Sequence, residues 1–101
     1  MSKNLNYGQA LEALQSGKIV TRPGWNGKGM WIFMQIGNTV PKSFIPNFKS
    51  LPDNVKAKLA DRDQDVIFNP SITMMTAQGS FQPGWLASQS DMFATDWEVV
   101  E

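Results

Sequence analysis

The sequence predicts an α+β fold in one small domain: a short N-terminal helix packed on a mostly antiparallel β-sheet, with an irregular, partly helical excursion in the middle. One segment with helical spacing lies near the N-terminus, and short runs rich in β-branched and aromatic residues follow it, separated by glycine and proline turns. The chain has 101 residues, of which 42% are hydrophobic, and this suits a single domain over residues 1–101.

The first predicted element is a helix whose apolar residues follow the i, i+3, i+4, i+7 spacing of one buried stripe: Tyr7, Ala10, Leu11 and Leu14. Asn6 is placed to cap this helix, and Gln9 follows at the position that completes a capping box. Gly17 is placed to end it.

The predicted strands are apolar runs that stop at turn residues: Lys18–Arg22, Met30–Ile36, Ser71–Ala77, Ser80–Ala87 and Trp97–Val100. Met30–Ile36 is apolar at nearly every position, which predicts a strand buried on both faces or covered by another subunit. The turn residues Gln78 and Gly79 predict a hairpin between the third and fourth of these runs.

Residues 38–70 are predicted to be an insertion within the domain. Prolines interrupt this stretch, so no long element is expected there. Residues 50–53 resemble a cap and first turn for a short helix over Val55–Ala60. A further short helix is expected at Met92–Ala94, because Ser88 and Asp91 match the capping-box spacing ahead of it.

The composition excludes several kinds of chemistry. The chain has no cysteine and no histidine, which excludes disulfides, thiolate nucleophiles, Cys/His zinc sites and imidazole acid–base catalysis. The acidic run Asp61–Asp65 resembles the start of a calcium loop, but it lacks the glycine and glutamate that such a loop needs, so no metal site is predicted.

The charges are divided unevenly along the chain. Nine basic and nine acidic residues cancel overall, yet residues 1–50 carry a net +5 and residues 51–101 a net −5. This division favours one half folding over the other, or subunits meeting through complementary surfaces, and argues against a protein that coats DNA or RNA. No apolar run approaches the length of a membrane span, and no signal peptide is recognisable, so a soluble, intracellular protein is expected.

The segment Gly24–Gly29 is the densest glycine cluster of the chain. It does not match a phosphate-binding P-loop, because the spacing is too short and a strand rather than a helix is expected after it. A hairpin connection built on Asn26 and Gly27 explains the glycines but not Trp25. The indole of Trp25 is either a platform that stacks on a purine base or a plug of the core, and the sequence leaves both interpretations open.

Side chains around this turn extend the candidate site. The Asn26 amide can read a base edge, and Gly24 and Gly27 allow a ligand to approach the backbone closely. Arg22 and Lys28 are either cations that neutralise a diphosphate or ordinary hairpin charges.

The segment Ser88–Met92 is a second candidate. In the structural interpretation, Ser88 caps the helix and Asp91 closes the capping box. In the functional interpretation, the backbone N–H groups at the start of the helix offer an anion site, while Gln89 and Asp91 hydrogen-bond ribose hydroxyls. The two interpretations are compatible.

Four blocks of this sequence together resemble the Thoeris anti-defense family of the second type, small phage and bacterial proteins: Tyr7–Leu14, Arg22–Met30, Trp85–Met92 and Asp96–Val100. The resemblance implies a non-enzymatic sponge that acts in the host cell cytoplasm. Members of the family sequester glyco-cyclic ADP-ribose signals, which host TIR-domain enzymes make on infection, and so inhibit Thoeris defence. Some members also hold cyclic oligonucleotides (dinucleotides or trinucleotides) at separate sites.

The resemblance further implies homotetramers with ligand pockets between subunits. By motif, Trp25 and Asn26 stack on and read the base, Tyr7 stands where the family usually has a phenylalanine, and Gln89 and Asp91 face the sugar. No catalytic residue and no cofactor are expected. The predicted ligand-binding residues are Tyr7, Arg22, Gly24, Trp25, Asn26, Gly27, Lys28, Ser88, Gln89, Asp91 and Met92.

Two alternatives from other functional classes stay open. The first is a metal-assisted nucleotide hydrolase that uses Asp91 or Asp96 with a divalent cation. The second is a structural oligomerisation module whose methionine- and tryptophan-rich strands serve only protein contacts.

Overall fold

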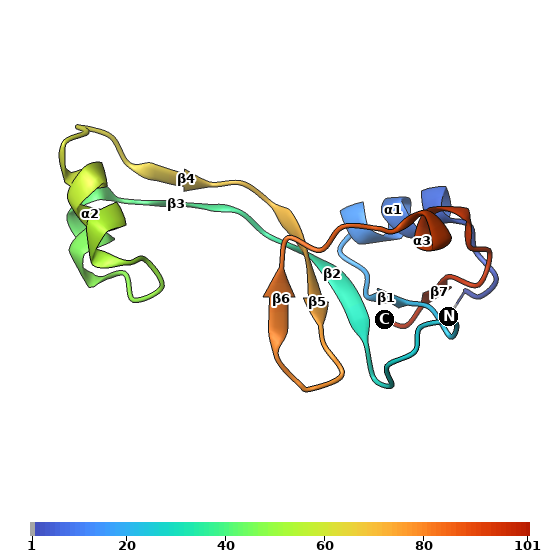
Figure 1. Ribbon diagram of the computed structural model, residues 1–101. Helices are drawn as coiled ribbons and strands as arrows, with labels where there is room; N and C mark the ends of the chain where they lie inside the picture. Colours follow the sequence, from blue (N-terminus) through green and yellow to red (C-terminus); the bar gives the residue numbers. More distant parts are fainter. Residues whose placement is uncertain (1) are drawn as a thin grey trace. The chain divides into compact units, whose positions relative to one another are not determined.

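A computed structural model describes residues 2–101 and confirms the predicted α+β fold with a mostly antiparallel sheet (Figure 1). The elements in chain order are α1 (Tyr7–Gln15), β1 (Val20–Thr21), β2 (Trp31–Gln35), β3 (Asn38–Val40), the 3-10 helix η1 (Lys42–Asn47), α2 (Asp53–Ala60), β4 (Val66–Phe68), β5 (Ser71–Met75), β6 (Phe81–Pro83), α3 (Gln89–Phe93) and β7 (Glu98–Val99).

The chain forms two compact units. Unit 1 contains residues 2–35 and 71–101, and unit 2 is Ile36–Pro70. Each unit has its own sheet: five strands in unit 1 and two in unit 2.

The sheet of unit 1 has the strand order β6-β5-β2-β1-β7, with every neighbouring pair antiparallel. Val20 lies opposite Ile32, which lies opposite Met74, so these three side chains share one face of the sheet. Helix α1 packs on this face, as Figure 1 shows for the right-hand part of the ribbon. The buried core is Ala10, Leu14, Val20, Ile32, Met74 and Trp97.

Local sequence signals fix both ends of α1 as predicted. The Asn6 side chain accepts a hydrogen bond from the Gln9 backbone, and the Gln9 side chain accepts one from the Asn6 backbone, so the capping box is confirmed. Gly17 follows the helix at φ +86°, a conformation that favours glycine.

The opposite face of the sheet carries an aromatic cluster. The ring centroids of Trp31, Phe33 and Phe81 lie 5.3 to 6.3 Å apart. Trp31 and Phe33 are half-buried and Phe81 is 57% exposed, so the expectation that Met30–Ile36 is buried on both faces is wrong within one copy. Only the face that carries Ile32 meets α1. Covering of the other face by another subunit stays a prediction.

The predicted C-terminal hairpin forms, but its second strand is short. Gly79 occupies the turn at φ +86°, as the turn residues predicted. Strand β6 ends at Pro83 instead of continuing to Ala87, because Gly84 takes φ +72° and turns the chain. The capping box at Ser88 and Asp91 is confirmed and begins α3.

Unit 2 contains more secondary structure than the sequence indicated. Strands β3 and β4 pair antiparallel, with Val40 opposite Val66, and η1 and α2 lie between them in the chain. Helix α2 confirms the helix predicted over Val55–Ala60, although Pro52 occupies its N-cap and no side chain caps it. Strand β3, η1 and β4 were not predicted.

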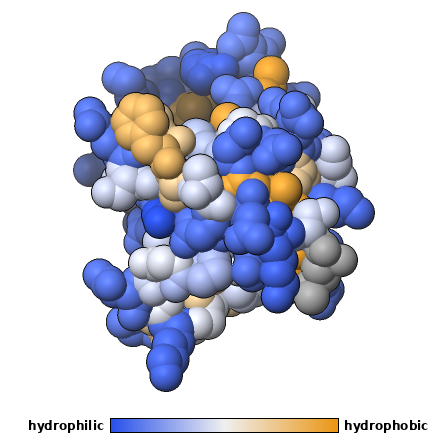
Figure 2. Space-filling view, turned by 90° about the vertical axis from the view of Figure 1, so that its right-hand side faces the viewer, coloured by the Kyte–Doolittle hydropathy of each residue, from blue (hydrophilic) through white to orange (hydrophobic). Residues whose placement is uncertain are grey.

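The surface around the chain termini is mostly hydrophilic, with apolar side chains in small separate groups (Figure 2). None of the helices within residues 2–101 is long and apolar enough to cross a membrane.

Candidate functional site

The two predicted site segments meet in unit 1 through a buried carboxylate. The Trp25 indole nitrogen Nε1 donates to Oδ1 of Asp91 at 2.8 Å, and Arg22 Nη1 donates to the same oxygen at 2.6 Å. Asp91 lies on α3, whereas Arg22 and Trp25 lie in the connection between β1 and β2. The fold therefore joins segments that are more than 60 residues apart in the sequence.

Asp91 is saturated with intramolecular partners. Its other carboxylate oxygen, Oδ2, accepts from the backbone N–H and the hydroxyl of Ser88, both at 2.9 Å. Its backbone carbonyl accepts from Trp97 Nε1 at 3.0 Å. The residue is only 7% exposed. These bonds hold Trp25, Arg22 and the start of α3 in place, and the expectation that Asp91 faces a ribose stays a prediction.

Asp96 is a second anchor of the same turn. Its Oδ1 accepts from Arg22 Nε at 2.7 Å, and its Oδ2 accepts from the Gly24 backbone N–H at 2.8 Å. A Cβ atom at position 24 would lie 2.7 Å from Oδ2 of Asp96 and 3.0 Å from Nη2 of Arg22. Glycine at this position therefore lets the carboxylate reach the backbone amide.

The hydrogen bonds keep both acids ionised. Burial by itself would raise the pKa of Asp91, but hydrogen bonds from Trp25, Ser88 and Arg22 outweigh it and hold the pKa below its ordinary value. Burial likewise opposes ionisation of Asp96, and its hydrogen bonds from Arg22 and Gly24 lower its pKa overall. Arg22 is thus a half-buried cation shared by two carboxylates.

Trp25 belongs to a cluster of aromatic side chains in unit 1. Its ring contacts Trp97 edge-on at a centroid distance of 5.4 Å and Trp85 at 6.0 Å. Tyr7, from α1, lies 5.6 Å from Trp97 and is half-buried, and burial followed by the charge of Asp91 raises its pKa. Trp25 is itself half-buried, so it packs against the core and also keeps part of its surface accessible.

The remaining predicted site residues differ in how firmly the fold holds them. Asn26, Lys28 and Gln89 are exposed, and their side chains make no hydrogen bond within the described residues 2–101. Gly27 is packed closely, because a Cβ there would overlap Met30 Sδ. Met92 is 43% exposed on α3.

Asp96 is not among the predicted ligand-binding residues. The sequence indicated it only as a carboxylate that a metal-assisted hydrolase could use. Its partners are 72 and 74 residues away, and no local pattern marks them. For the hydrolase alternative, a divalent cation would have to displace Arg22 from both carboxylates. Within residues 2–101, no group of three or more acidic side chains is positioned to hold a metal ion.

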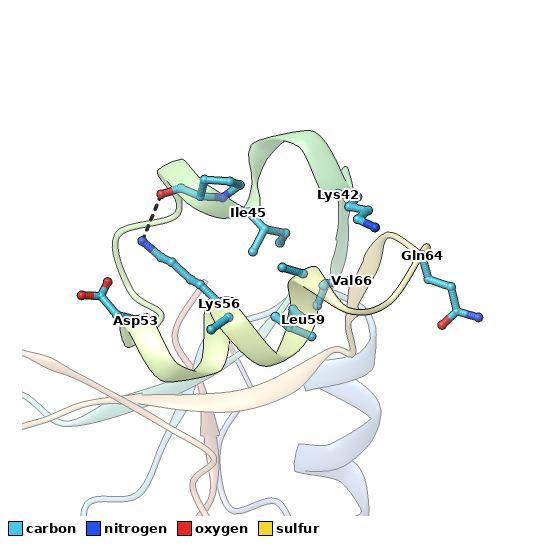
Figure 3. A pocket seen from close by; sticks show the side chains of 10 residues that line it. Lys42, Ile45, Asp53, Lys56, Leu59, Gln64 and Val66 are labelled. Atoms are coloured by element: carbon cyan, nitrogen blue, oxygen red, sulfur yellow. Dashed lines mark hydrogen bonds between the residues drawn. The ribbon is translucent and has the colours of Figure 1, made fainter.

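A cleft lies away from the predicted site residues (Figure 3). It has a volume of about 360 Å³ and lies in unit 2, and none of the predicted site residues lines it.

Comparison with known proteins gives two matches. The family model of the Thoeris anti-defense 2-like domain matches residues 5–100. Thoeris anti-defense 2 of Bacillus phage SP01 is 30% identical over 100 residues, which cover 99% of this chain and 99% of that protein. Both matches extend through residues 38–70.

Proposed function

The chain belongs to the Thoeris anti-defense 2-like family, and from this premise we propose that it sequesters a cyclic ADP-ribose-type signal, glyco-cyclic ADP-ribose, without converting it. Its anti-defense role follows from the family. The ligand and the mode of action are the proposal, with the host cell cytoplasm as the place of action.

The observation that carries the proposal is that hydrogen bonds hold Trp25 and the backbone of its turn, Gly24–Gly29, in place. Asp91 fixes the indole nitrogen and Asp96 fixes the backbone at Gly24, so an aromatic surface is held in place before a ligand arrives. A site that is already ordered loses little conformational entropy on binding, which favours tight and slowly reversible capture. A purine base is the part of the ligand that stacks on such a surface.

The charges around the turn assign different tasks to the two cations. Arg22 already forms salt bridges with Asp91 and Asp96, so its main task is to stabilise the turn that carries Trp25. Lys28 is exposed and has no acidic partner within residues 2–101, so it is the cation available to a diphosphate. Asn26 and Gln89 supply exposed amides for the base edge and the ribose hydroxyls.

The same electrostatics support sequestration rather than catalysis. A general base works best with a pKa near the working pH. The pKa values of Asp91 and Asp96 are instead lowered, and both carboxylates are bonded to Arg22. With no histidine or cysteine in the chain, this site is suited to holding a nucleotide intact.

The proposed assembly is a homotetramer with ligand pockets between subunits. Two exposed surfaces of unit 1 support association. One is the aromatic face that carries Phe81, and the other is the region near α3 where Leu86 and Phe93 are 87% and 80% exposed. Apolar surfaces of this kind commonly mark protein contacts.

Calorimetric titration of the full chain with glyco-cyclic ADP-ribose tests the proposal. We expect binding at micromolar or lower concentration, and we expect Asn26→Ala and Lys28→Ala each to weaken it by about tenfold, or about 1.4 kcal/mol. Lys18→Ala is the matched control, because Lys18 is an exposed lysine at the distant α1–β1 turn. Trp25→Ala is a less clean test, since it also removes contacts with Trp85 and Trp97.

Recovery of the ligand after denaturation separates a sponge from an enzyme. Intact ligand supports sequestration, whereas a hydrolysed product supports the hydrolase alternative, and absence of binding overturns the proposal. A cyclic dinucleotide added to the saturated complex shows whether it displaces the first ligand or binds at a separate site.

A further inference from the structure

Asn26 stands before a glycine in an exposed turn of unit 1. Of the asparagines in the chain, it alone is followed by glycine. Glycine has no Cβ atom to shield its backbone nitrogen, so that nitrogen has open access to the side-chain amide of the residue before it. An asparagine before a glycine is therefore the type of site at which a chain loses a side-chain amide without an enzyme, and Asn26 meets this condition.

The hydrogen bonds that hold this turn lie at its two ends. At the start, the Gly24 N–H donates to Asp96 at 2.8 Å. At the end, the Thr21 hydroxyl donates to the Met30 carbonyl at 2.6 Å. Between these anchors, none of the backbone N–H groups of Asn26–Gly29 donates a hydrogen bond within the part of the chain that the structure describes. The middle of the turn therefore lacks the backbone bonds that would restrain it.

The two groups that would react at Asn26 are free of competing bonds. The Asn26 side chain is exposed, and neither its amide nor the Gly27 N–H makes a hydrogen bond among the described residues. Asn54 is the contrasting case. It is also exposed, but the β-branched Val55 follows it, and the Val55 N–H donates to the Pro52 carbonyl at 3.1 Å in the first turn of α2. Local structure thus protects Asn54 and leaves Asn26 unprotected.

We propose that Asn26 is a site of spontaneous deamidation. Hydroxide removes the proton of the Gly27 N–H, and the nitrogen attacks Cγ of Asn26. The bond from Cγ to Nδ2 breaks, and the amide nitrogen takes a proton from water and leaves as ammonia, so the hydroxide is regenerated and a cyclic succinimide remains. Water then adds to one of the two ring carbonyls and cleaves its bond to the ring nitrogen. The products are aspartate or isoaspartate at position 26.

Deamidation changes the charge and the length of the turn that carries Trp25. The neutral amide of Asn26 both donates and accepts, whereas the carboxylate of the product only accepts. The new negative charge lies two residues from Lys28, the cation that the proposed function assigns to a diphosphate, and it repels such a ligand. Isoaspartate also adds one carbon to the backbone. Resting on the proposed function, the inference is that capture of the ligand declines as the protein ages.

Ageing of the wild-type protein tests the chemistry without a ligand. The folded full chain is incubated at mildly alkaline pH and cleaved after lysine, and the peptides that end at Lys28 and Lys56 are analysed by mass spectrometry. We expect the first, which contains Asn26, to exchange NH₂ for OH at least about tenfold faster than the second, which contains Asn54. Freshly purified protein treated in parallel measures deamidation during cleavage. Equal rates at the two sites overturn the inference.

Gly27→Ala tests the route through the Gly27 nitrogen. The added Cβ would lie 3.1 Å from the Ala77 Cβ and overlap Met30 Sδ, which is the end of a flexible side chain and can turn aside. Because the methyl group shields the nitrogen, we expect deamidation of Asn26 to slow by at least about tenfold. Near-UV circular dichroism shows whether the variant keeps its tertiary structure. A folded variant that deamidates at the wild-type rate contradicts this route.

The effect on ligand capture has a separate test. Asn26→Asp reproduces the charge of one product, and we expect it to bind glyco-cyclic ADP-ribose about tenfold more weakly than Asn26→Ala in calorimetric titration. Aged wild-type protein is expected to lose binding sites in proportion to its deamidated fraction. Full binding by deamidated protein overturns the loss of capture. If fresh protein binds no ligand while Asn26 still deamidates, the proposed function fails together with its decline on ageing, and the deamidation site stands.

Discussion

The carboxylate of Asp91 links two parts of unit 1 through hydrogen bonds. It accepts hydrogen bonds from Trp25, Arg22 and Ser88, and these partners belong to the β1–β2 connection and to the cap of α3. Buried charges are stable only when their partners are complete, so this network is sensitive to the loss of any member.

Replacing Asp91 with Asn is expected to lower the free energy of unfolding by about 3 kcal/mol, because the Arg22 side chain, only 13% exposed, is left with Asp96 as its single carboxylate partner. Urea denaturation at pH 7 measures the loss. Asp61→Asn is the control, since it removes an exposed carboxylate, and it is expected to change the free energy by about 0.5 kcal/mol or less.

The stabilisation by Asp91 is expected to depend on pH. The pKa of Asp91 is lowered from its ordinary value of 3.8, so its stabilisation is fully present above that value and is lost as the pH falls through the lower folded pKa. The difference between wild type and Asp91→Asn therefore narrows below about pH 4. An unchanged difference in acid would contradict this account of Asp91.

At the scale of elements, the sequence predicted those structures whose signals are local. The capping boxes of α1 and α3 each involve residues only three positions apart, and both are confirmed. Strands β3 and β4 were missed because each has only three residues, too few for a visible alternation. Their stability comes from pairing with each other, which no local pattern reveals.

Gly37→Ala is expected to destabilise the β3–β4 ribbon. A Cβ at this position would overlap the backbone carbonyl oxygen of Phe68 and lie 2.8 Å from the nitrogen of Pro70. The segment at Gly37 would therefore have to move away from the segment at Phe68–Pro70. We expect a loss of about 2 kcal/mol in unit 2, the usual size of an overpacking effect. Thermal unfolding followed by circular dichroism measures it.

Gly79→Ala is the control for backbone strain without a clash. Gly79 has φ +86°, but nothing lies within 4 Å of an added Cβ. We therefore expect the free energy of unfolding to fall by about 1 kcal/mol, through destabilisation of the β5–β6 hairpin. A larger loss for Gly79→Ala than for Gly37→Ala would show that close approach at Gly37 is not the limiting feature.

At the scale of the whole molecule, the opposite charges of the two sequence halves meet directly. Arg22 from the basic first half is held by Asp91 and Asp96 from the acidic second half. This outcome supports the first of the two interpretations of the charge division, folding of one half over the other. The division along the sequence does not coincide with the two spatial units, because unit 2 takes residues from both halves.

Hydrogen exchange is expected to distinguish the two units. Strands β2 and β5 pair along their full length and carry the buried residues Ile32 and Met74, whereas α2 has no buried residue. At low protein concentration, peptides from β2 and β5 are therefore expected to exchange at least tenfold more slowly than peptides from α2. Exchange at equal rates would show that the chain unfolds as one cooperative unit.

The sequence by itself determined the fold class, the capped helices, the hairpin turn and the blocks that carry the family resemblance. These features depend on spacing over a few residues and on residue type. Tertiary structure decided what Trp25 and Asp91 do, because their partners are distant in the chain. It shows that the Trp25 indole is bonded to Asp91, packed against Trp97 and half-buried, and its role as a platform for a base stays a prediction. It also gave Asp96 a role, because only folding brings that carboxylate to Arg22 and Gly24.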